Sequence, residues 1–388
     1  MSGEDRVVIV GAGPAGVSAA RGYRDAGGQA EVVLLGAEPH HPYERPPLSK
    51  DYLRGEHGRD GLFLEPEGRY HELGIDLRLG CAVAELDPAA RRVVTQEGEE
   101  LRFGGCVLAT GSEPLRLPVP GGDGEHLLTI REMEDSERLQ SQSASGVAAT
   151  VVGSGFIGCE AAVSLAMRGC RVTLVSDEDA PHARHLGDEV GAILTEWLHE
   201  AGVTTRMGAA VDAFGEDARS LSAGGEEVIA DVTLMAAGIV PRIGLAEAAG
   251  LSVEDGRVCT DASMHTSADN VFAAGDIALA TNQKAGRRLP VQHWGEALTQ
   301  GEVAGRTLAG EDARWEQAPG FWSTIGDRTL KYVAWGDGHD EVKLDRSDDG
   351  SFTAWYGQDG VVVGVLTHGR DNDYERGRTL VESGAALE

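Results

Sequence analysis

Two glycine-rich turns are the stretches of this 388-residue chain whose residue types and spacing point most directly to chemistry. The first is Gly11-Ala12-Gly13-Pro14-Ala15-Gly16, which follows the apolar run Val7–Val10 and precedes a helix-forming run over 17–26. The first glycine permits a tight turn, the second leaves room for a diphosphate beside the backbone, and the third lets the helix approach the strand. A diphosphate there meets the free N–H groups and the positive end of the helix dipole. Alone, the pattern is a weak signal, because a turn that only solves a packing problem can also produce it.

A second copy of the pattern occurs at Gly153-Ser154-Gly155-Phe156-Ile157-Gly158, between an apolar run and an alanine-rich helix. Two nucleotide sites in one chain suit an enzyme that passes electrons between two cofactors. The next strand, 171–175, ends at Ser176, where NAD-specific folds place an acid that binds the ribose. Three acids follow at 177–179, and they should repel the 2′-phosphate of NADPH. We therefore expect NADH as the electron donor.

Further candidates lie between these turns. Glu38 follows a strand expected at 31–35, where a carboxylate accepts hydrogen bonds from a ribose; a solvated loop carboxylate is the alternative. The loop 40–50 is proline-rich, so we expect no helix before Leu48. A rigid loop of this kind would present Arg45 and Lys50 as two fixed cations.

Several motifs resemble one family of flavoenzymes. They are Pro46-Pro47-Leu48-Ser49-Lys50, Ala109-Thr110-Gly111, the segment 266–276 ending in Gly275-Asp276, and Phe321-Trp322-Ser323. Their order over nearly the whole chain is similar to that in FAD-dependent NAD(P)H reductases of ferredoxin, rubredoxin and putidaredoxin, and in apoptosis-inducing factor. These belong to the pyridine nucleotide-disulfide oxidoreductase superfamily. No cysteine lies near the loop 40–50, unlike in the disulfide reductases of that superfamily.

The resemblance implies site residues. Those expected to contact FAD, besides the first turn, are Glu38, Arg45, Lys50, Val83, Thr110, Gly111, Arg131, Gly238, Gly275, Asp276, His293 and Trp294. Lys50, Glu160 and Trp322 are the expected catalytic residues, with Glu160 pairing with Lys50 near the nicotinamide. The alternatives are a helix-surface position for Glu160, a core tryptophan at 322, and for His293 either proton donation or packing beside the flavin.

The implied fold is α/β, with two Rossmann-like nucleotide-binding domains of glutathione-reductase type and a C-terminal α+β domain. We expect an FAD-binding domain from 1–115 and 244–318, an NAD(P)H-binding domain from 116–243, and an interface domain from 319–388. The serine-rich segment 136–146 predicts a spacer. Strands are expected at 331–335, 341–344, 352–356 and 361–366, followed by a helix from Tyr374.

Composition excludes several functions. The formal net charge of −29 should repel nucleic acid and anionic membranes. No apolar run is long enough for a membrane span, and the polar start is unlike a signal peptide, so we expect a cytoplasmic protein. The five cysteines show no close pair typical of a redox disulfide or zinc site, which favours reduced thiols and no metal.

The resemblance implies hydride transfer from NADH to FAD, and then transfer of single electrons to a [2Fe-2S] ferredoxin or a rubredoxin that serves an oxygenase. Lys50 would stabilise negative charge on reduced flavin. Electron transfer to a quinone or dioxygen, and a redox-gated interaction protein like apoptosis-inducing factor, are the alternatives. A monomer and a homodimer both remain open. Candidate basic contacts for an acidic partner, or else ordinary solvated charges, are Lys284, Arg287, Arg288, Arg328 and Lys331.

Overall fold

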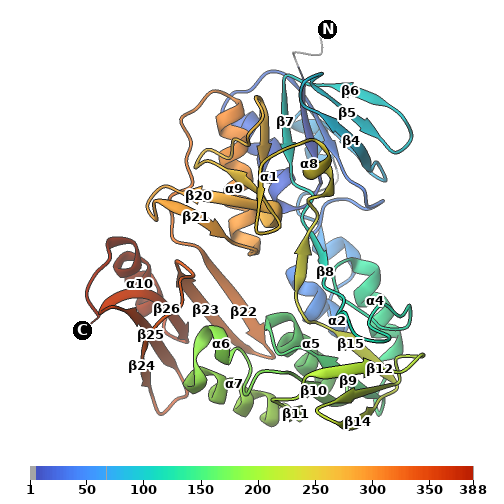
Figure 1. Cartoon of the computed structure of the whole chain (residues 1–388), viewed down its shortest axis with the longest axis vertical. Helices are drawn as coiled ribbons and strands as arrows, with labels where there is room; N and C mark the ends of the chain where they lie inside the picture. The colour runs from blue at the N-terminus through green and yellow to red at the C-terminus, as the bar shows by residue number, and fades with distance from the viewer. Residues whose placement is uncertain (1–5, 67, 388) are drawn as a thin grey trace.

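The computed structural model describes residues 6–66 and 68–387. Figure 1 shows three bodies: an upper one that combines the blue start of the chain with orange segments, a lower one in green, and a red C-terminal one beside it. The predicted α/β fold with a C-terminal α+β domain is confirmed.

The upper body is built on a parallel sheet with strand order β19-β7-β1-β2-β3. Its strands alternate between two cores because successive side chains point to opposite faces. Val7 and Ile9 pack with helices α1 and α9, whereas Val8 and Val10 pack with the antiparallel sheet β4–β6. These elements are β1 (Arg6–Val10), α1 (Pro14–Asp25), β2 (Glu31–Leu35), β3 (Ile75–Arg78), β4 (Val83–Asp87), β5 (Arg92–Thr95), β6 (Glu100–Arg102), β7 (Gly105–Leu108), β19 (Val271–Ala273) and α9 (Trp294–Leu308).

Helices α1 and α9 approach each other unusually closely. A Cβ on Gly301 would lie 2.1 Å from the carbonyl oxygen of Ala15, and one on Gly305 would lie 2.1 Å from that of Ala19. These two glycines are one turn apart, so one bare face of α9 rests on the backbone of α1. The contact fixes the start of α9 next to the first glycine turn.

The green body repeats the plan, with parallel strand order β11-β10-β9-β15. In each sheet the strand that leads into the glycine turn is β1 or β9. The chain continues from it to strands on one side of the sheet first and later returns to strands on its other side, so this strand marks the topological switch point. Ligands of doubly wound sheets bind at that position. The elements are β9 (Ala148–Val152), α5 (Phe156–Met167), β10 (Arg171–Val175), α6 (Ala183–Leu186), α7 (Asp188–Glu200), β11 (Thr204–Arg206), β12 (Val211–Phe214), β13 (Ser220–Ala223), β14 (Glu226–Ile229) and β15 (Val232–Met235).

The chain passes between the two bodies through a paired crossing. Strands β8 (Ser112–Pro114) and β16 (Ile239–Pro241) run antiparallel, one leaving the upper body and one returning. The predicted spacer at 136–146 is wrong, since helix α4 (Met133–Gln142) occupies most of it. A capping box between Glu132 and Asp135 starts this helix, and its Met133, Ser136 and Leu139 are buried on one face.

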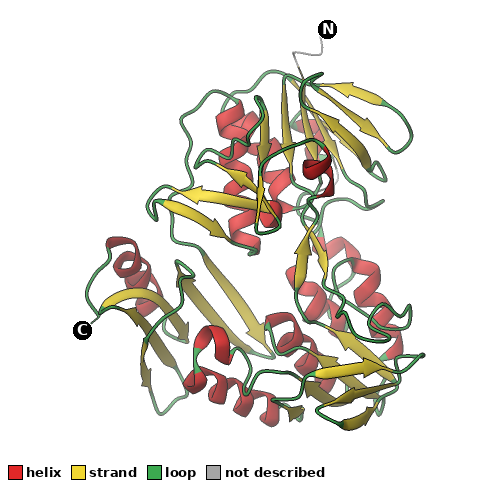
Figure 2. Cartoon of the chain, in the orientation of Figure 1, coloured by secondary structure: helices red, strands yellow, loops and turns green. Residues whose placement is uncertain are grey.

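The C-terminal body is an antiparallel sheet with order β22-β23-β26-β25-β24 and one helix, α10, as Figure 2 shows. The four predicted strands are present. The segment around Trp322 is a strand as well, which the sequence reasoning treated only as a motif. Helix α10 begins at Asp371 rather than Tyr374. The acidic side chains in its first turn interact favourably with the positive end of the helix dipole. The elements are β22 (Gly320–Ile325), β23 (Arg328–Ala334), β24 (Glu341–Arg346), β25 (Phe352–Gln358), β26 (Val361–His368) and α10 (Asp371–Ser383).

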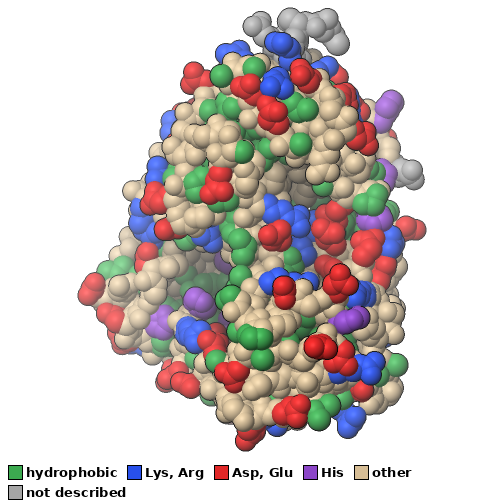
Figure 3. All heavy atoms as spheres, turned by 45° about the vertical axis from the view of Figure 1, so that its right-hand side comes forward, with side chains coloured by type: hydrophobic (Ala, Val, Ile, Leu, Met, Phe, Trp, Pro, Cys, Tyr) green, Lys and Arg blue, Asp and Glu red, His purple; other side chains and the backbone are tan. Residues whose placement is uncertain are grey.

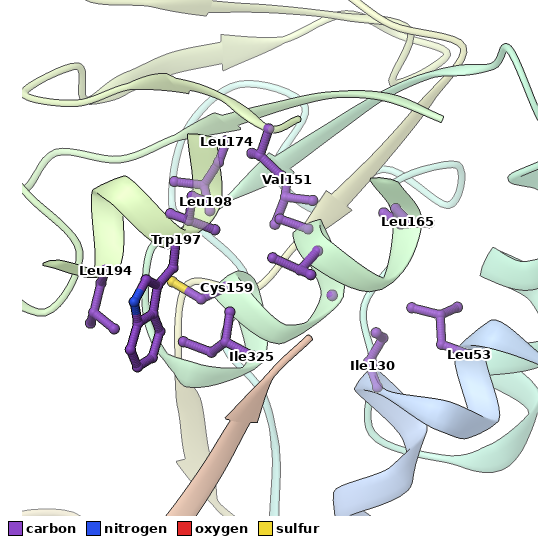
Figure 4. Close-up of a cluster of buried hydrophobic side chains, with 14 of the residues drawn as sticks. Leu53, Ile130, Val151, Cys159, Leu165, Leu174, Leu194, Trp197, Leu198 and Ile325 are labelled. Atoms are coloured by element: carbon purple, nitrogen blue, oxygen red, sulfur yellow. The ribbon is translucent and has the colours of Figure 1, made fainter. Parts of the chain in front are cut away.

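A single hydrophobic cluster joins segment 43–63, the green body and the C-terminal body. Figure 4 shows Leu53 from the proline-rich loop region, Cys159 from α5 and Ile325 from β22 within it, together with Trp197 of α7. The loop itself forms a 3₁₀ turn from Pro46 to Ser49, earlier than predicted, because proline is tolerated in a first helical turn. The remaining elements are α2 (Asp51–Arg54), the 3₁₀ turns Arg59–Leu62 and Gly275–Ile277, α3 (Arg69–Glu72), α8 (Gly244–Ala248), β17 (Val253–Glu254), β18 (Arg257–Thr260), β20 (Ala278–Asn282) and β21 (Arg287–Pro290).

Across the described residues, every helix is too short or too polar to span a bilayer.

Candidate functional site

The first glycine turn has the geometry that a diphosphate needs. Gly11 has φ +111°, and a Cβ on it would lie 2.1 Å from the carbonyl oxygen of Ala109. A Cβ on Gly16 would lie 1.8 Å from the carbonyl oxygen of Gly11, whereas one on Gly13 would meet nothing within 4 Å. Two glycines therefore serve close packing, and the middle one borders open space at the start of α1.

The second turn repeats this division of roles. Gly153 has φ +107°, and a Cβ on Gly158 would lie 2.0 Å from its carbonyl oxygen. Gly155 again borders open space at the start of α5, next to Phe156 and Ile157. The packing explanation accounts for the outer glycines of both turns. It does not account for the bare middle ones, which fit nucleotide phosphates.

A cleft of about 310 Å³ opens from the first turn. Its lining includes the first glycine turn, Val83 at the start of β4 and Ala297 in the first turn of α9. Twelve of the residues expected to contact FAD line it: Gly11, Gly13, Pro14, Ala15, Glu38, Arg45, Val83, Thr110, Gly111, Arg131, Gly275 and Asp276.

Glu38 is held at this cleft by two donors. Its carboxylate accepts hydrogen bonds from Arg45 Nη2 at 2.6 Å and Tyr43 Oη at 2.5 Å. Burial alone would raise the pKa of Glu38, but Arg45 and the Tyr43 hydroxyl outweigh it and lower the pKa. Glu38 is therefore an ionised, fixed acceptor rather than a freely solvated loop carboxylate, as binding ribose hydroxyls requires.

Arg131 and Asp276 form an ion pair in the lining of the cleft. Arg131 Nη2 lies 3.0 Å from Asp276 Oδ2, which also accepts a hydrogen bond from Ser112 Oγ at 2.5 Å. Burial lowers the pKa of Arg131 despite this partner. Its Nε is buried without a hydrogen-bond partner among the described residues, which leaves a donor free for a ligand oxygen. The cleft residues thus fit FAD.

Lys50 and Glu160 come together, although they are 110 positions apart. Lys50 Nζ donates to Glu160 Oε2 at 2.8 Å. Ser49 Oγ donates to the same oxygen at 2.5 Å, and Ser323 Oγ donates to Oε1 at 2.7 Å. Glu160 is only 5% exposed, so the helix-surface alternative is wrong. The pair sits where the three bodies meet.

Aromatic side chains continue from this junction to the start of α9. Phe321 lies 4.5 Å from Phe156 and 4.6 Å from His293 between ring centroids. Burial lowers the pKa of His293 to about 4, so the ring is neutral near pH 7. Its Nδ1 has no hydrogen-bond partner among the described residues. Trp322 is 51% exposed, which excludes the core-tryptophan alternative.

The end of β10 carries the expected nucleotide-specificity region. Ser176 is buried, and its hydroxyl lies 2.8 Å from that of Ser154, so it points back into the turn. Asp177 is exposed and pairs with Arg184 at 2.8 Å. The sequence reasoning did not identify this arginine.

Five of the residues expected to contact FAD lie outside the cleft lining. Gly16 packs beneath the turn, and Lys50, His293 and Trp294 lie toward the junction of the bodies. Gly238, with φ +121°, lies at the crossing, where its carbonyl accepts from Leu115 N. The sequence reasoning also missed the side chains that hold the predicted ones: Tyr43, Ser49, Ser112 and Ser323. Ser49 and Ser323 lie inside the recognised motifs, the only signal available for them.

The candidate basic contacts are all neutralised. Each has an acidic partner: Lys284 with Glu382, Arg287 with Asp337, Arg288 with Glu254, Arg328 with Glu200, and Lys331 with Asp371. On the face in Figure 3, blue and red side chains are likewise interspersed rather than gathered by sign.

Comparisons with known proteins agree with this geometry. Residues 5–301 match the family model "Pyridine nucleotide-disulphide oxidoreductase", and residues 320–388 match "Reductase C-terminal". The chain is 34% identical to a ferredoxin–NAD(P)(+) reductase of a Sphingomonas species, over 98% of this chain and 94% of the relative. It is 30% identical to human apoptosis-inducing factor 3, over 100% of this chain and 64% of that protein.

Among solved structures, the covalent putidaredoxin reductase–putidaredoxin complex matches with a TM-score of 0.93 and 30% identity, covering 99% of this chain and 94% of the other. The predicted resemblance is confirmed. Members of the matched family use FAD and NAD(P)H, and the cleft and the two turns provide for both. This chain is therefore an oxidoreductase that belongs to the pyridine nucleotide-disulphide oxidoreductase family and carries its reductase-type C-terminal domain.

Proposed function

We propose that the protein is an FAD-dependent NADH:ferredoxin-type reductase, which takes electrons in pairs from NADH and passes them singly to a small iron–sulfur protein. One observation carries the proposal: two diphosphate-shaped glycine turns occur in one chain, with the Lys50–Glu160 pair where their domains meet. The names of the relatives support the acceptor class, since they include ferredoxin reductases of dioxygenase systems. FAD, when bound, supplies the conversion between two-electron and one-electron transfer.

The chain's own residues bind and orient the cofactor. Glu38 would accept hydrogen bonds from ribose hydroxyls at one end of the cleft. Arg131 would hold the diphosphate beside the backbone of Gly13, which carries no side chain. Asp276 would accept hydrogen bonds from hydroxyl groups farther along FAD, and His293 and Trp294 would lie beside the flavin ring. Because these groups are fixed by buried contacts, little reorganisation is needed when the ligand binds.

Lys50 supplies positive charge where negative charge develops during reduction. Its ammonium group is mostly buried, with 15% of its side chain exposed, so it acts through a medium of low dielectric. Glu160 holds that ammonium group in place from the other nucleotide domain. Trp322, exposed on β22, would flank the bound nucleotides.

NADH is the proposed donor. A 2′-phosphate near the end of β10 would meet Asp177, Glu178 and Asp179. Two cations lie nearby, and both have acidic partners: Arg184 pairs with Asp177 and Arg206 with Glu226. Like-charge repulsion of this kind favours the unphosphorylated ribose.

We also propose the domain boundaries 1–115 with 244–318, 116–243 and 319–388, since the β8–β16 crossing lies close to two of them. A cytoplasmic location is proposed because all five cysteines are free thiols, as in reducing compartments.

An acceptor panel tests the function. The FAD-loaded protein is given NADH and, in turn, a [2Fe-2S] ferredoxin, a rubredoxin, a quinone and dioxygen. Fast turnover with an iron–sulfur protein is expected. Fast turnover only with quinone or dioxygen would refute the acceptor class. Slow turnover with all acceptors, together with NADH-dependent dimerisation, would instead indicate a redox-gated interaction protein, the second candidate that the relationship to apoptosis-inducing factor 3 raises.

A further inference from the structure

The carboxylate of Glu160, on α5 of the green body, is held by donors from two other parts of the chain. From the proline-rich loop, Ser49 and Lys50 donate to its Oε2. From the C-terminal sheet, Ser323 donates to its Oε1. Ser323 is 1% exposed and Ser49 is 4% exposed, so water does not compete freely for these contacts.

We propose that Ser323 is a positioning residue for the Lys50–Glu160 pair, through which the C-terminal domain fixes the charge arrangement beside the flavin. This inference rests on the proposed function. The terminal torsion of a glutamate side chain is broad, so one oxygen held by Lys50 and Ser49 leaves the carboxylate plane poorly defined. A donor at the second oxygen defines that plane, and with it the direction in which Glu160 holds Lys50 Nζ.

The Ser323 hydroxyl is itself fixed by packing. On β22, Phe321, Ser323 and Ile325 point to one face and Trp322 points to the other, as the alternation of a strand requires. Ile325 is buried in the cluster of Figure 4 beside Cys159, the neighbour of Glu160 on α5. Phe321 contacts Phe156 at the start of the same helix. The residues two positions before and after Ser323, Phe321 and Ile325, thus pack toward α5 and fix the position of the hydroxyl.

The Ser323 contact can be removed without disturbing the other hydrogen bonds around Glu160. Among the described residues, its hydroxyl donates to Glu160 alone. Ser49, by contrast, also accepts at its carbonyl from Ser164 Oγ, one turn beyond Glu160 on α5. Ser323→Ala therefore removes one contact to the carboxylate and leaves the loop anchored.

The neighbouring Thr324 provides a matched control. It lies on the opposite face of β22, where its hydroxyl is 3.1 Å from that of Thr329. Thr324→Val removes one hydroxyl contact from the same strand without touching Glu160.

The test is a double-mutant cycle on the FAD-loaded protein, mixed anaerobically with NADH. Ser323→Ala should slow flavin reduction about tenfold at saturating NADH, the loss expected for one hydrogen bond to a charged group, with the NADH concentration at half-saturation unchanged. In a Glu160→Gln background the same change should have less than about a twofold effect, because the two residues act together. Thr324→Val should behave as wild type.

Two further measurements separate positioning from mere stability. The visible spectrum of the bound flavin should shift in Ser323→Ala and not in Thr324→Val, at equal FAD content and similar melting temperature. If Ser323→Ala does not fold, Ser323→Cys keeps the shape of the side chain with a larger atom that is a weaker donor, and it should give an intermediate rate.

An unchanged rate in Ser323→Ala, or an equal slowing in the Glu160→Gln background, would overturn the inference. If the wild-type protein bound no FAD, or NADH failed to reduce it, the proposed function itself would fail, and this outcome is visible before any variant is compared.

Discussion

Replacing Gly13 by alanine tests the first glycine turn with a single methyl group. Gly13 has φ −79° and ψ −172°, which alanine adopts without strain. A Cβ at this position meets nothing within 4 Å. The protein without FAD should therefore unfold no more easily than wild type, and it should gain about 0.4–1 kcal/mol from the lower entropy of the unfolded chain.

The same methyl group should weaken FAD binding strongly. It occupies space where the diphosphate approaches the backbone, so at least one hydrogen bond to phosphate is lost. Such a bond to a charged group is worth about 1.5–3 kcal/mol, which corresponds to about a 10- to 150-fold loss of affinity. Isothermal titration of the FAD-free protein with FAD measures this loss, and thermal unfolding measures the stability.

Gly16→Ala is the contrasting variant. Its Cβ would lie 1.8 Å from the carbonyl oxygen of Gly11, so it should destabilise the fold by about 1–3 kcal/mol even without ligand. Gly155→Ala in the second turn should retain FAD and bind NADH weakly. If Gly13→Ala bound FAD like wild type, or melted like Gly16→Ala, the division of roles within the turn would be wrong.

Three other outcomes follow from the site. Tyr43→Phe removes one of the two donors to Glu38 and should weaken FAD binding about fivefold, seen by titration; unchanged binding would contradict the role of the tyrosine. Asp177→Ala releases Arg184 and should raise the NADPH/NADH ratio of kcat/KM at least about tenfold, whereas the double variant with Arg184→Ala should not. The pKa of Glu38 is lowered in the folded protein, so its stabilising contribution is present above the ordinary value of 4.5 and is lost as the pH falls through the lower folded value. Glu38→Gln should therefore flatten the acid limb of the unfolding free energy against pH, and an unaltered limb would refute this.

Local patterns in the sequence were sufficient to predict much of the fold of this protein. The glycine turns, the strand that enters each of them and the motif around Asp276 are each contained within a few residues, so their consequences for backbone and phosphate binding can be read locally. The prediction failed where distant packing decided the outcome. Segment 136–146 looks like a spacer by composition, yet the buried face of Met133, Ser136 and Leu139 makes most of it helical.

The sequence by itself determined that two Rossmann-like folds lie in one chain and to which family the pattern belongs, and it predicted which residues would border each diphosphate. Only the tertiary structure decided that Glu160 is buried rather than exposed, that Ser323 reaches it from 163 positions away, and that every candidate docking cation already has an acidic partner. Turn geometry depends on neighbours along the chain. Burial and charge pairing depend on which surfaces meet in space, and no local pattern specifies that meeting.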